Sequence, residues 1–351
     1  MKFIHAADVH LGASPDAGSS YTENRQKELW NSFERLLEVC EKEQVDLLLI
    51  AGDLFHRQPL LRELKEVDYL FSRLTHTRVV LIAGNHDYLK KDSYYRTFKW
   101  SAPVHMFLSQ TMEYVEYEDL GVCIYGLSYE QKEIPAALYD SAVPGRRQPI
   151  EILLAHGGDE KHIPINRNKI VDLGYDYVAM GHIHLPMEIE KNKVCYSGAL
   201  EPIDKNDTGC HGYIRGEIVD GVVQSVFVPF AAREYVHMEV ETEKSMTSRA
   251  VKEKVTEAIK KRGIQNLYKI ILTGYRDTDM LYDLESMDVY GNILEIVDDT
   301  KPAYDFEKLE RQNKDNLLGR YIERLKGSEK GSIEYQALFE GVQALLDTKR
   351  G

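Results

Sequence analysis

The chain of 351 residues is long enough for one large domain with one or two smaller ones. Hydrophobic residues make up 43% and charged residues 29%, as in ordinary globular proteins, and no run of 18 apolar residues offers a membrane-spanning helix. The net charge of −13 comes without an obvious basic stretch, which argues against a protein that grips nucleic acid unaided.

Short apolar strands alternate with helical periods up to about residue 185, and this pattern predicts a layered α/β domain. Residues 29–40 carry apolar side chains at helical spacing. Two hairpins are expected, over 112–127 and 212–228, and the second contains an Asp220–Gly221 turn signal. The strand-like segments are 3–7, 46–51, 78–84, 150–156 and 177–182.

The character of the chain changes near residue 232. Residues 233–300 follow a strand–helix–strand–helix–strand order, which predicts a small α/β cap domain. After Pro302, residues 301–351 read as two amphipathic helices. The sequence therefore predicts three parts, of which the first is 1–232.

Polar residues that can bind metals gather where the predicted strands end. They are Asp8 and His10 after the first strand, Asp53 after the second, Asn85, His86 and Asp87 after the third, His156 at the end of the fourth, and His182 and His184 after the fifth. Open α/β sheets place their binding crevice at the carboxyl ends of strands. Because an unpaired buried charge is very costly, so many ionisable groups need a compensating partner, and divalent cations would supply it.

The types of ligand constrain the metal. Imidazole, carboxylate and one amide oxygen, without thiolate, suit Mn²⁺ or Fe²⁺, with Zn²⁺ possible. Seven ligand side chains are too many for one ion but suit two if Asp53 bridges them. Two metal ions about 3.5–4 Å apart are the arrangement used for in-line displacement at phosphorus.

Each cluster also has a plainer explanation. A strand ending in Gly-Asp is often a turn, Asn85 to Asp87 could form an asparagine turn, and His182 and His184 could lie on a surface loop. Five clusters in one order, each closing a strand pattern, make coincidence a poor explanation.

The motifs D-x-H, G-D, G-N-H-D, H-G and G-H-x-H, in that order, resemble the calcineurin-like metallophosphoesterases. Within that family, "ADVHLG", "GDLFH" and "GNHD" resemble the SbcD-type nucleases, the DNA-repair exonuclease partners of SbcC-like ATPases. The resemblance covers roughly residues 1–200. It implies an α/β sandwich of two sheets flanked by helices, with a small α/β cap domain and C-terminal helices.

The resemblance also implies roles for individual residues. One metal would take Asp8, His10, Asp53 and His184, and the other Asp53, Asn85, His156 and His182. His86 would protonate the leaving group or steady the transition state, and Asp87 would orient the His86 ring through a hydrogen bond. His56 matches a histidine of SbcD-like nucleases and favours a DNA phosphodiester over a phosphoprotein. The alternative for His56 is a helix-start residue that contacts solvent.

These features predict a Mn²⁺-dependent DNA nuclease subunit with two metal ions. The sequence has no G-x-x-x-x-G-K-[ST] motif, so an SbcC-like coiled-coil ATPase would be a separate chain, and the C-terminal helices would dock on its coiled coil. Those helices could instead pack on their own domain. The resemblance suggests a homodimer, with the stretch Tyr21 to Trp30 as one candidate contact.

Two other functions stay open at this point. The chain could be a phosphodiesterase for nucleotides or another small diester, which suits an acidic surface better. It could also be a metal-binding scaffold, although every expected ligand position is filled. The loop after "YSGALEP" reads "IDKNDTGCHGY" and departs from the family pattern, which puts its substrate contacts in doubt.

A cytoplasmic location is expected. The start "MKFIHAAD" enters a strand pattern without the features of a signal peptide. Cys40, Cys123, Cys195 and Cys210 are scattered without a C-x-x-C pair, which is typical of reduced thiols.

Overall fold

A computed structural model of the chain describes residues 1–16, 22–329 and 331–350. The chain forms two compact units, Met1–Val236 with Gln265–Leu267, and His237–Ile264 with Tyr268–Gly351. Tyr21, at one end of the stretch expected at a dimer contact, lies outside the described residues.

The first unit contains two six-stranded sheets. The first sheet has the order β12-β11-β1-β2-β3-β4, made of Val222–Pro229, Gly212–Val219, Lys2–Ala6, Leu47–Ala51, Arg78–Ile82 and Val104–Met106. The second has the order β5-β6-β7-β8-β10-β9, made of Glu113–Tyr117, Val122–Gly126, Ile150–His156, Tyr177–Gly181, Val194–Tyr196 and Met187–Glu190. These bounds confirm the strands expected from the sequence.

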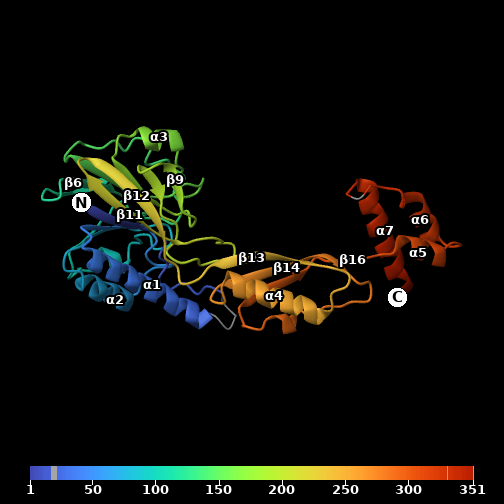
Figure 1. Cartoon of the computed structure of the whole chain (residues 1–351). Helices are drawn as coiled ribbons and strands as arrows, with labels where there is room; N and C mark the ends of the chain where they lie inside the picture. The colour runs from blue at the N-terminus through green and yellow to red at the C-terminus, as the bar shows by residue number, and fades with distance from the viewer. Residues whose placement is uncertain (17–21, 330, 351) are drawn as a thin grey trace. The chain divides into compact units, whose positions relative to one another are not determined.

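Helices cover the outer faces of the two sheets. The long helices α1 (Thr22–Glu43) and α2 (Leu61–Ser72) lie on one side, and the short α3 (Arg167–Asp172) lies on the other (Figure 1). Because side chains alternate across a strand, Phe3 points between the sheets while Ile4 packs with the α1 side. Both faces of the central strands are therefore buried, and the predicted two-sheet α/β sandwich is confirmed.

Parallel pairing fixes where the strands deliver their next residues. Strands β1, β2 and β3 pair in parallel in the first sheet, as do β7 and β8 in the second. Each strand is followed directly by one of the polar clusters, so the clusters of three neighbouring strands share one sheet edge. The second sheet brings His156 and the cluster after β8 to its corresponding edge.

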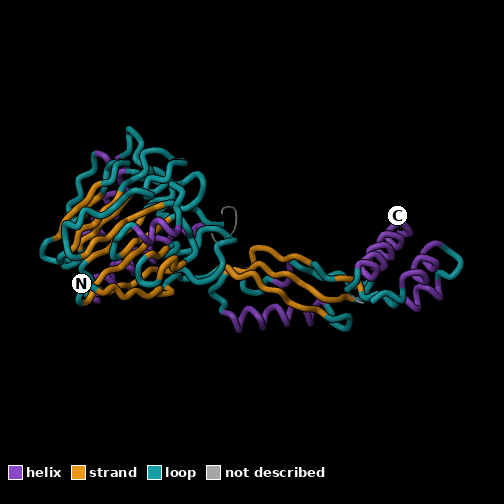
Figure 2. The backbone as a smooth tube through the Cα atoms, turned by 90° about the horizontal axis from the view of Figure 1, so that it is seen from above, coloured by secondary structure: helices purple, strands orange, loops and turns teal. Residues whose placement is uncertain are grey.

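Among its described residues, the second unit holds a smaller sheet, four α-helices and a short 3-10 helix, Glu285–Met287. In the sheet, β14 (Leu267–Arg276) pairs in parallel with β15 (Ile293–Asp298) and β16 (Lys301–Pro302), and β13 (Tyr235–Thr242) is its other edge. Helix α4 (Ser248–Arg262) runs alongside these strands and buries one apolar face (Figure 2). The three-part division at residues 232 and 300 stays a prediction.

The expectation of two C-terminal helices is wrong, because the first of them is broken. Helices α5 (Phe306–Gln312) and α6 (Leu317–Leu325) are separate, and α7 (Ile333–Arg350) follows. The Asn316 side chain accepts hydrogen bonds from two backbone N–H groups of α6, so it starts a new helix. The helices share a core of Leu318, Ile322, Leu338 and Val342.

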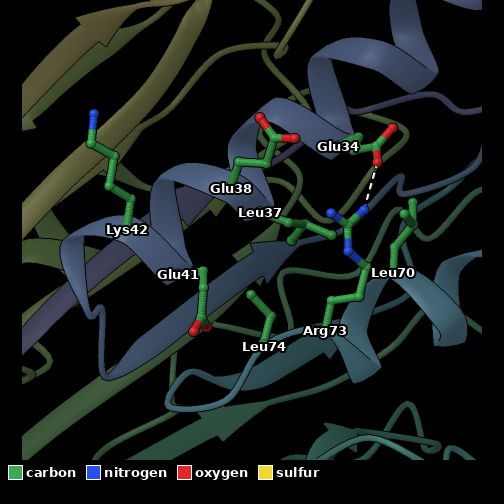
Figure 3. Close-up of a pocket in the computed structure, with 8 residues that line it drawn as sticks. All are labelled: Glu34, Leu37, Glu38, Glu41, Lys42, Leu70, Arg73 and Leu74. Atoms are coloured by element: carbon green, nitrogen blue, oxygen red, sulfur yellow. Dashed lines mark hydrogen bonds and ion pairs between the residues drawn. The ribbon is translucent and has the colours of Figure 1, made fainter.

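Helices α1 and α2 also leave a groove between them (Figure 3). Its floor includes Leu37, Leu70 and Leu74, and Arg73 on its rim pairs with Glu34. The last turns of α1 and α2 lead into the amino ends of β2 and β3, which places this groove opposite the polar clusters. Among the helices in the described residues, none has the length and apolar character needed to cross a membrane.

A close approach between β1 and β11 sets a stability prediction. A Cβ at Gly216 would lie 2.0 Å from the Phe3 ring, which is fully buried between the sheets. Gly216→Ala should therefore lower the free energy of unfolding of the first unit by about 1–3 kcal/mol, since overpacking forces side chains off their preferred rotamers. Urea denaturation measures the change.

Gly327→Ala is the matched control, because nothing lies within 4 Å of the Cβ that it would add. It should change stability by less than about 0.5 kcal/mol. Equal stability of the two variants would contradict the tight packing of β11 on β1.

Candidate metal centre

The backbone bends sharply where the polar clusters leave their strands. Positive φ angles occur at Asp8 (50°), His10 (52°), Asp53 (51°) and His182 (96°). Residues other than glycine rarely adopt this conformation, and such strain concentrates at functional sites. The backbone is therefore strained at four of the predicted ligand positions, and the surrounding packing must stabilise this conformation.

Two glycines make room for the converging side chains. A Cβ at Gly84 would lie 2.2 Å from Asp53 Oδ1 and 2.7 Å from His156 Nε2. A Cβ at Gly52 would lie 2.3 Å from His156 Nδ1, and Gly52 has a φ of +90°. The glycines of the G-D and G-N-H-D motifs are therefore needed because His156 and Asp53 pass directly over them.

The proton on His156 can be placed from its neighbours. Nδ1 lies 2.8 Å from the carbonyl oxygen of Ala51, which can only accept, so Nδ1 carries a proton. Nε2 then faces two more acceptors, Asn85 Oδ1 at 3.0 Å and Asp53 Oδ2 at 3.4 Å. Burial opposes charge on this ring, but the Asp53 carboxylate together with Asp8 and the Ala51 carbonyl outweighs it and raises the pKa of His156 to about 9. A bound proton thus stands in for a cation at Nε2.

Both ring nitrogens of His182 also face acceptors, but here Nδ1 rather than Nε2 is the nitrogen next to Asn85. Nε2 lies 2.7 Å from the carboxylate of Asp159, and Nδ1 lies 3.0 Å from Asn85 Oδ1. Burial, with the positive charge on His156, lowers the pKa of His182 to about 4, so the ring is neutral at pH 7. With its proton on the Asp159 side, the Nδ1 lone pair meets another acceptor at Asn85.

A second group of potential metal ligands is made of Asp8, His10 and His184. Asp8 Oδ2 accepts from the backbone N–H of His182 at 2.9 Å, whereas its buried Oδ1 has no hydrogen-bond partner among the described residues. His10 Nε2 lies 3.9 Å from Asp8 Oδ1 and 3.1 Å from His184 Nε2. His184 Nδ1 contacts Asp207 Oδ2 at 2.9 Å, and its Nε2 faces His10. Burial opposes charge on this ring, but Asp207, Asp8 and Asp53 together raise the pKa of His184 to about 9, so a proton occupies Nε2 in the absence of a cation.

The donor set fits divalent cations. Ligands about 2.1 Å from one cation and at right angles to each other lie about 3.0 Å apart, close to several of the distances above. Ligand atoms of Asp53, Asp8 and His156 lie within 4.8 Å of one another, so Asp53 is next to the Asp8 group as well as to His156. Burial alone would raise the pKa of Asp53, but the positive charge of His156 and then His10 hold it well below its usual range. The orphaned Asp8 oxygen and the facing lone pairs are the atoms that such ions would satisfy.

His56 and His86 lie beside the metal-binding groups rather than on a distant surface. His86 Nδ1 donates to the carbonyl oxygen of His56 at 3.0 Å, and the two rings are 4.7 Å apart. His56 Nδ1 lies 3.3 Å from His10 Nδ1. Both rings remain partly exposed. The structure therefore places His56 and His86 together at the rim of the site.

The expected hydrogen bond from Asp87 to the His86 ring is wrong for the described residues. The Asp87 carboxylate instead accepts from the N–H groups of Phe55 and Gly84 and from the hydroxyl of Tyr95. Burial, with the nearby charge of Asp53, raises the pKa of Asp87 to about 7. Asp87 therefore connects the loops after β2 and β3 through hydrogen bonds, and it makes no hydrogen bond to the His86 ring.

Several residues at the site carry no motif that would have revealed them. Asp159 and Asp207 contact the two histidines of G-H-x-H, and Asp207 lies in the loop that departs from the family pattern. The Tyr129 hydroxyl donates to the carbonyl of His156, and the Tyr139 hydroxyl accepts from its N–H. The acid in "HGGD" was a weak signal for Asp159.

Comparisons with known proteins found a family and a relative that the chain resembles. A family model described as calcineurin-like phosphoesterase matches residues 1–186, which include every residue placed at the site by sequence. A protein of Bacillus subtilis (strain 168), named "Uncharacterized metallophosphoesterase YhaO", is 31% identical to the chain over 251 residues. This alignment covers 65% of the chain and 60% of that protein, so the chain spans about 60% of the length of this relative.

Metal binding should stabilise the first unit. Mn²⁺ added to chelator-treated protein at about 100 times its dissociation constant should contribute about 2.7 kcal/mol, because it binds the folded donor set and not the unfolded chain. For a domain of this size the midpoint of thermal unfolding should rise by about 5–10 °C. Differential scanning calorimetry measures the shift.

Gly84→Ala tests whether the shift comes from this site. The added Cβ would displace Asp53 and His156, so the Mn²⁺-dependent shift should disappear. A wild-type midpoint that does not move with Mn²⁺, or an unchanged shift in Gly84→Ala, would contradict the assignment.

Proposed function

Because the chain belongs to the calcineurin-like phosphoesterase family, whose members are metal-dependent phosphoester hydrolases, we propose that it hydrolyses phosphodiester bonds in DNA. The observation that carries this proposal is the position of His56. Its ring lies against both His86 and His10, at the partly exposed rim of the metal-binding groups. A bystander at a helix start would not be expected to make both contacts.

The seven ligand residues divide into two sets that share Asp53. Asp8, His10, Asp53 and His184 would hold one ion, and Asp53, Asn85, His156 and His182 the other. When bound, two divalent ions neutralise a phosphate and lower the pKa of a water molecule so that it can attack phosphorus. The donor set of imidazole, carboxylate and amide oxygen favours Mn²⁺, with Fe²⁺ or Zn²⁺ as alternatives.

The two rim histidines act on the substrate in this proposal. His86 is oriented by the hydrogen bond from its Nδ1 to the His56 carbonyl. In the doubly protonated ring, Nε2 carries the second proton and would deliver it to the leaving oxygen, which leaves a neutral imidazole with its proton on Nδ1. With His10 bound to metal through Nε2, its Nδ1–H can donate to His56 Nδ1. His56 then keeps its proton on Nε2, where it can donate to a non-bridging phosphate oxygen or a flanking phosphate.

Asp87 acts beneath these groups as a positioning residue. Its carboxylate holds the N–H groups of Phe55 and Gly84, next to His56 and Asn85. Through these contacts it would fix the spacing between the loop of the bridging Asp53 and the loop of His86. Its contribution to hydrolysis would therefore be indirect.

A DNA substrate also implies partners. The net charge of −13 leaves little basic surface for a duplex, so we propose that an SbcC-like coiled-coil ATPase in another chain and a second copy of this chain complete the DNA-binding surface. The apolar faces once expected to dock this ATPase pack against each other in the α5–α7 core. Docking would then fall to exposed apolar residues of these helices, such as Leu317 and Ile333.

The acidic charge favours a second candidate, a phosphodiesterase for nucleotides or other small diesters. Such an enzyme would use the same metal groups and His86, because the reaction at phosphorus is the same. It would need neither a long DNA-binding surface nor a partner. The contribution of His56 separates the two candidates.

Hydrolysis by the purified chain with Mn²⁺ tests the proposal on end-labelled duplex DNA and on a soluble model phosphodiester. His86→Ala should lower the rate on both substrates by about 10²–10⁴-fold, because the leaving oxygen loses its proton donor. His56→Ala should lower DNA cleavage more than cleavage of the soluble diester.

His76→Ala is the matched control, since His76 is an exposed histidine that pairs with Asp46. It should leave both rates unchanged. Hydrolysis of the soluble diester alone, with equal rates in His56→Ala and wild type, would support the small-molecule enzyme and reject the DNA nuclease.

A further inference from the structure

We propose that Asp159 and Asp207 are positioning residues that separately control the two metal positions, each by fixing the tautomer of one histidine in the G-H-x-H motif. The inference rests on the metal-ligand assignment of the proposed function and assigns these two aspartates a role that no motif carries. Asp159 would act on the ion held by His182, and Asp207 on the ion held by His184.

The loop after β7 is folded to aim Asp159 at His182. Asp159 Oδ1 accepts from the backbone N–H groups of Lys161 and His162 at 2.8 and 3.0 Å. The His162 ring holds the same carboxylate from the side, with Nδ1 within 2.9 Å of both oxygens. Oδ2, which receives no backbone N–H from the described residues, lies 2.7 Å from His182 Nε2 and shares its contact with the His162 ring. Contacts within its own loop thus hold the Asp159 carboxylate in the position in which it meets His182.

Asp207 is held in a comparable way by a different loop. Its Oδ2 accepts from the backbone N–H groups of Ile203 and Asp204, both at 3.2 Å, and from His184 Nδ1 at 2.9 Å. This segment is the "IDKNDTGCHGY" loop, which departs from the family pattern. Although the sequence of this loop differs from the family pattern, the loop still provides His184 with a hydrogen-bond acceptor, Asp207.

The chemistry of imidazole explains why these contacts matter. A ring nitrogen binds a cation through its lone pair, so the proton of a neutral histidine must sit on the other nitrogen. The Asp159 carboxylate attracts that proton to Nε2 of His182, which leaves Nδ1 to face Asn85. The Asp207 carboxylate attracts it to Nδ1 of His184, which leaves Nε2 to face His10. The two histidines thus offer opposite nitrogens to the site.

The two carboxylates reach separate histidines. In the part of the chain that the structure describes, Asp159 contacts His182 and His162, and Asp207 contacts His184 and its own loop. Asp53 differs, because the proposed function assigns it to both ions and its ligand atom lies within 4.8 Å of those of Asp8 and His156. Loss of Asp53 should therefore remove both ions, whereas loss of Asp159 or Asp207 should weaken one and spare the other.

The experiment measures Mn²⁺ binding to the full chain after chelator treatment. Isothermal titration calorimetry gives the number and affinity of ions, and electron paramagnetic resonance distinguishes a spin-coupled pair from a single ion. Wild type should bind two coupled ions. Asp159→Ala and Asp207→Ala should each bind one ion with wild-type affinity and the other about 10–100-fold more weakly.

Double variants identify which ion is weakened. Asp159→Ala combined with Asn85→Ala should add little further loss, because both changes affect the ion held by His182. Asp159→Ala combined with His10→Ala should weaken both ions. Asp207→Ala should show the reverse pattern with the same two partners.

Asp140→Asn is the matched control, because this surface carboxylate pairs with Lys169. It should bind two ions as wild type does. Asp159→Asn and Asp207→Asn keep the size of the side chain and replace any alanine variant that fails to fold. Wild-type affinity for both ions in all four Asp159 and Asp207 variants would overturn the inference, as would equal loss of both ions in each. Failure of wild type to bind Mn²⁺ would instead reject the metal centre of the proposed function, and this inference with it.

Discussion

Oxygen and nitrogen atoms that carry lone pairs face one another at the carboxyl edges of the two sheets. Too few hydrogen-bond donors lie between them, and the site depends on positive charge to make up the difference. His156 and His182 both face the Asn85 oxygen, and one oxygen of Asp8 has no partner among the described residues. Protons relieve part of this, as the raised pKa values of His156 and His184 indicate. Two divalent cations would satisfy all of these atoms together, and their binding would then stabilise the fold.

The backbone around the site shows what this convergence costs. Four ligand positions have positive φ angles, and Gly52 and Gly84 keep a clear path for His156. Strain of this kind persists where the surroundings over-determine the geometry. Here the surroundings are central strands buried on both faces, together with Asp87, which ties the loops after β2 and β3. The sandwich thus supplies the rigidity that the strained turns lack.

The strands and the gathering of polar side chains where they end could be predicted from the sequence, because periodicity and strand-end motifs are local patterns. The contacts of Asp159 and Asp207 with the histidines could not, because they depend on loops that meet the histidines only in the folded chain. The Asp87 expectation failed for the same reason. Its neighbour in sequence is His86, but burial and three other donors direct its carboxylate away from that ring. The break after α5 was missed because the capping role of Asn316 depends on backbone geometry.

The acidic charge of the chain is compatible with a phosphate substrate once local and net charge are separated. Asp8 and Asp53 contribute two negative charges to the ligand set, and two divalent ions contribute four positive ones. The centre would therefore be positive within a negative protein, and its attraction for phosphate would be confined to the reacting bond. Such an enzyme would depend on other chains to hold the rest of a long polyanion, but would need no help to bind a small diester. The negative charge of the protein would thus discriminate between long and small phosphate substrates, and it would not change the chemistry at phosphorus.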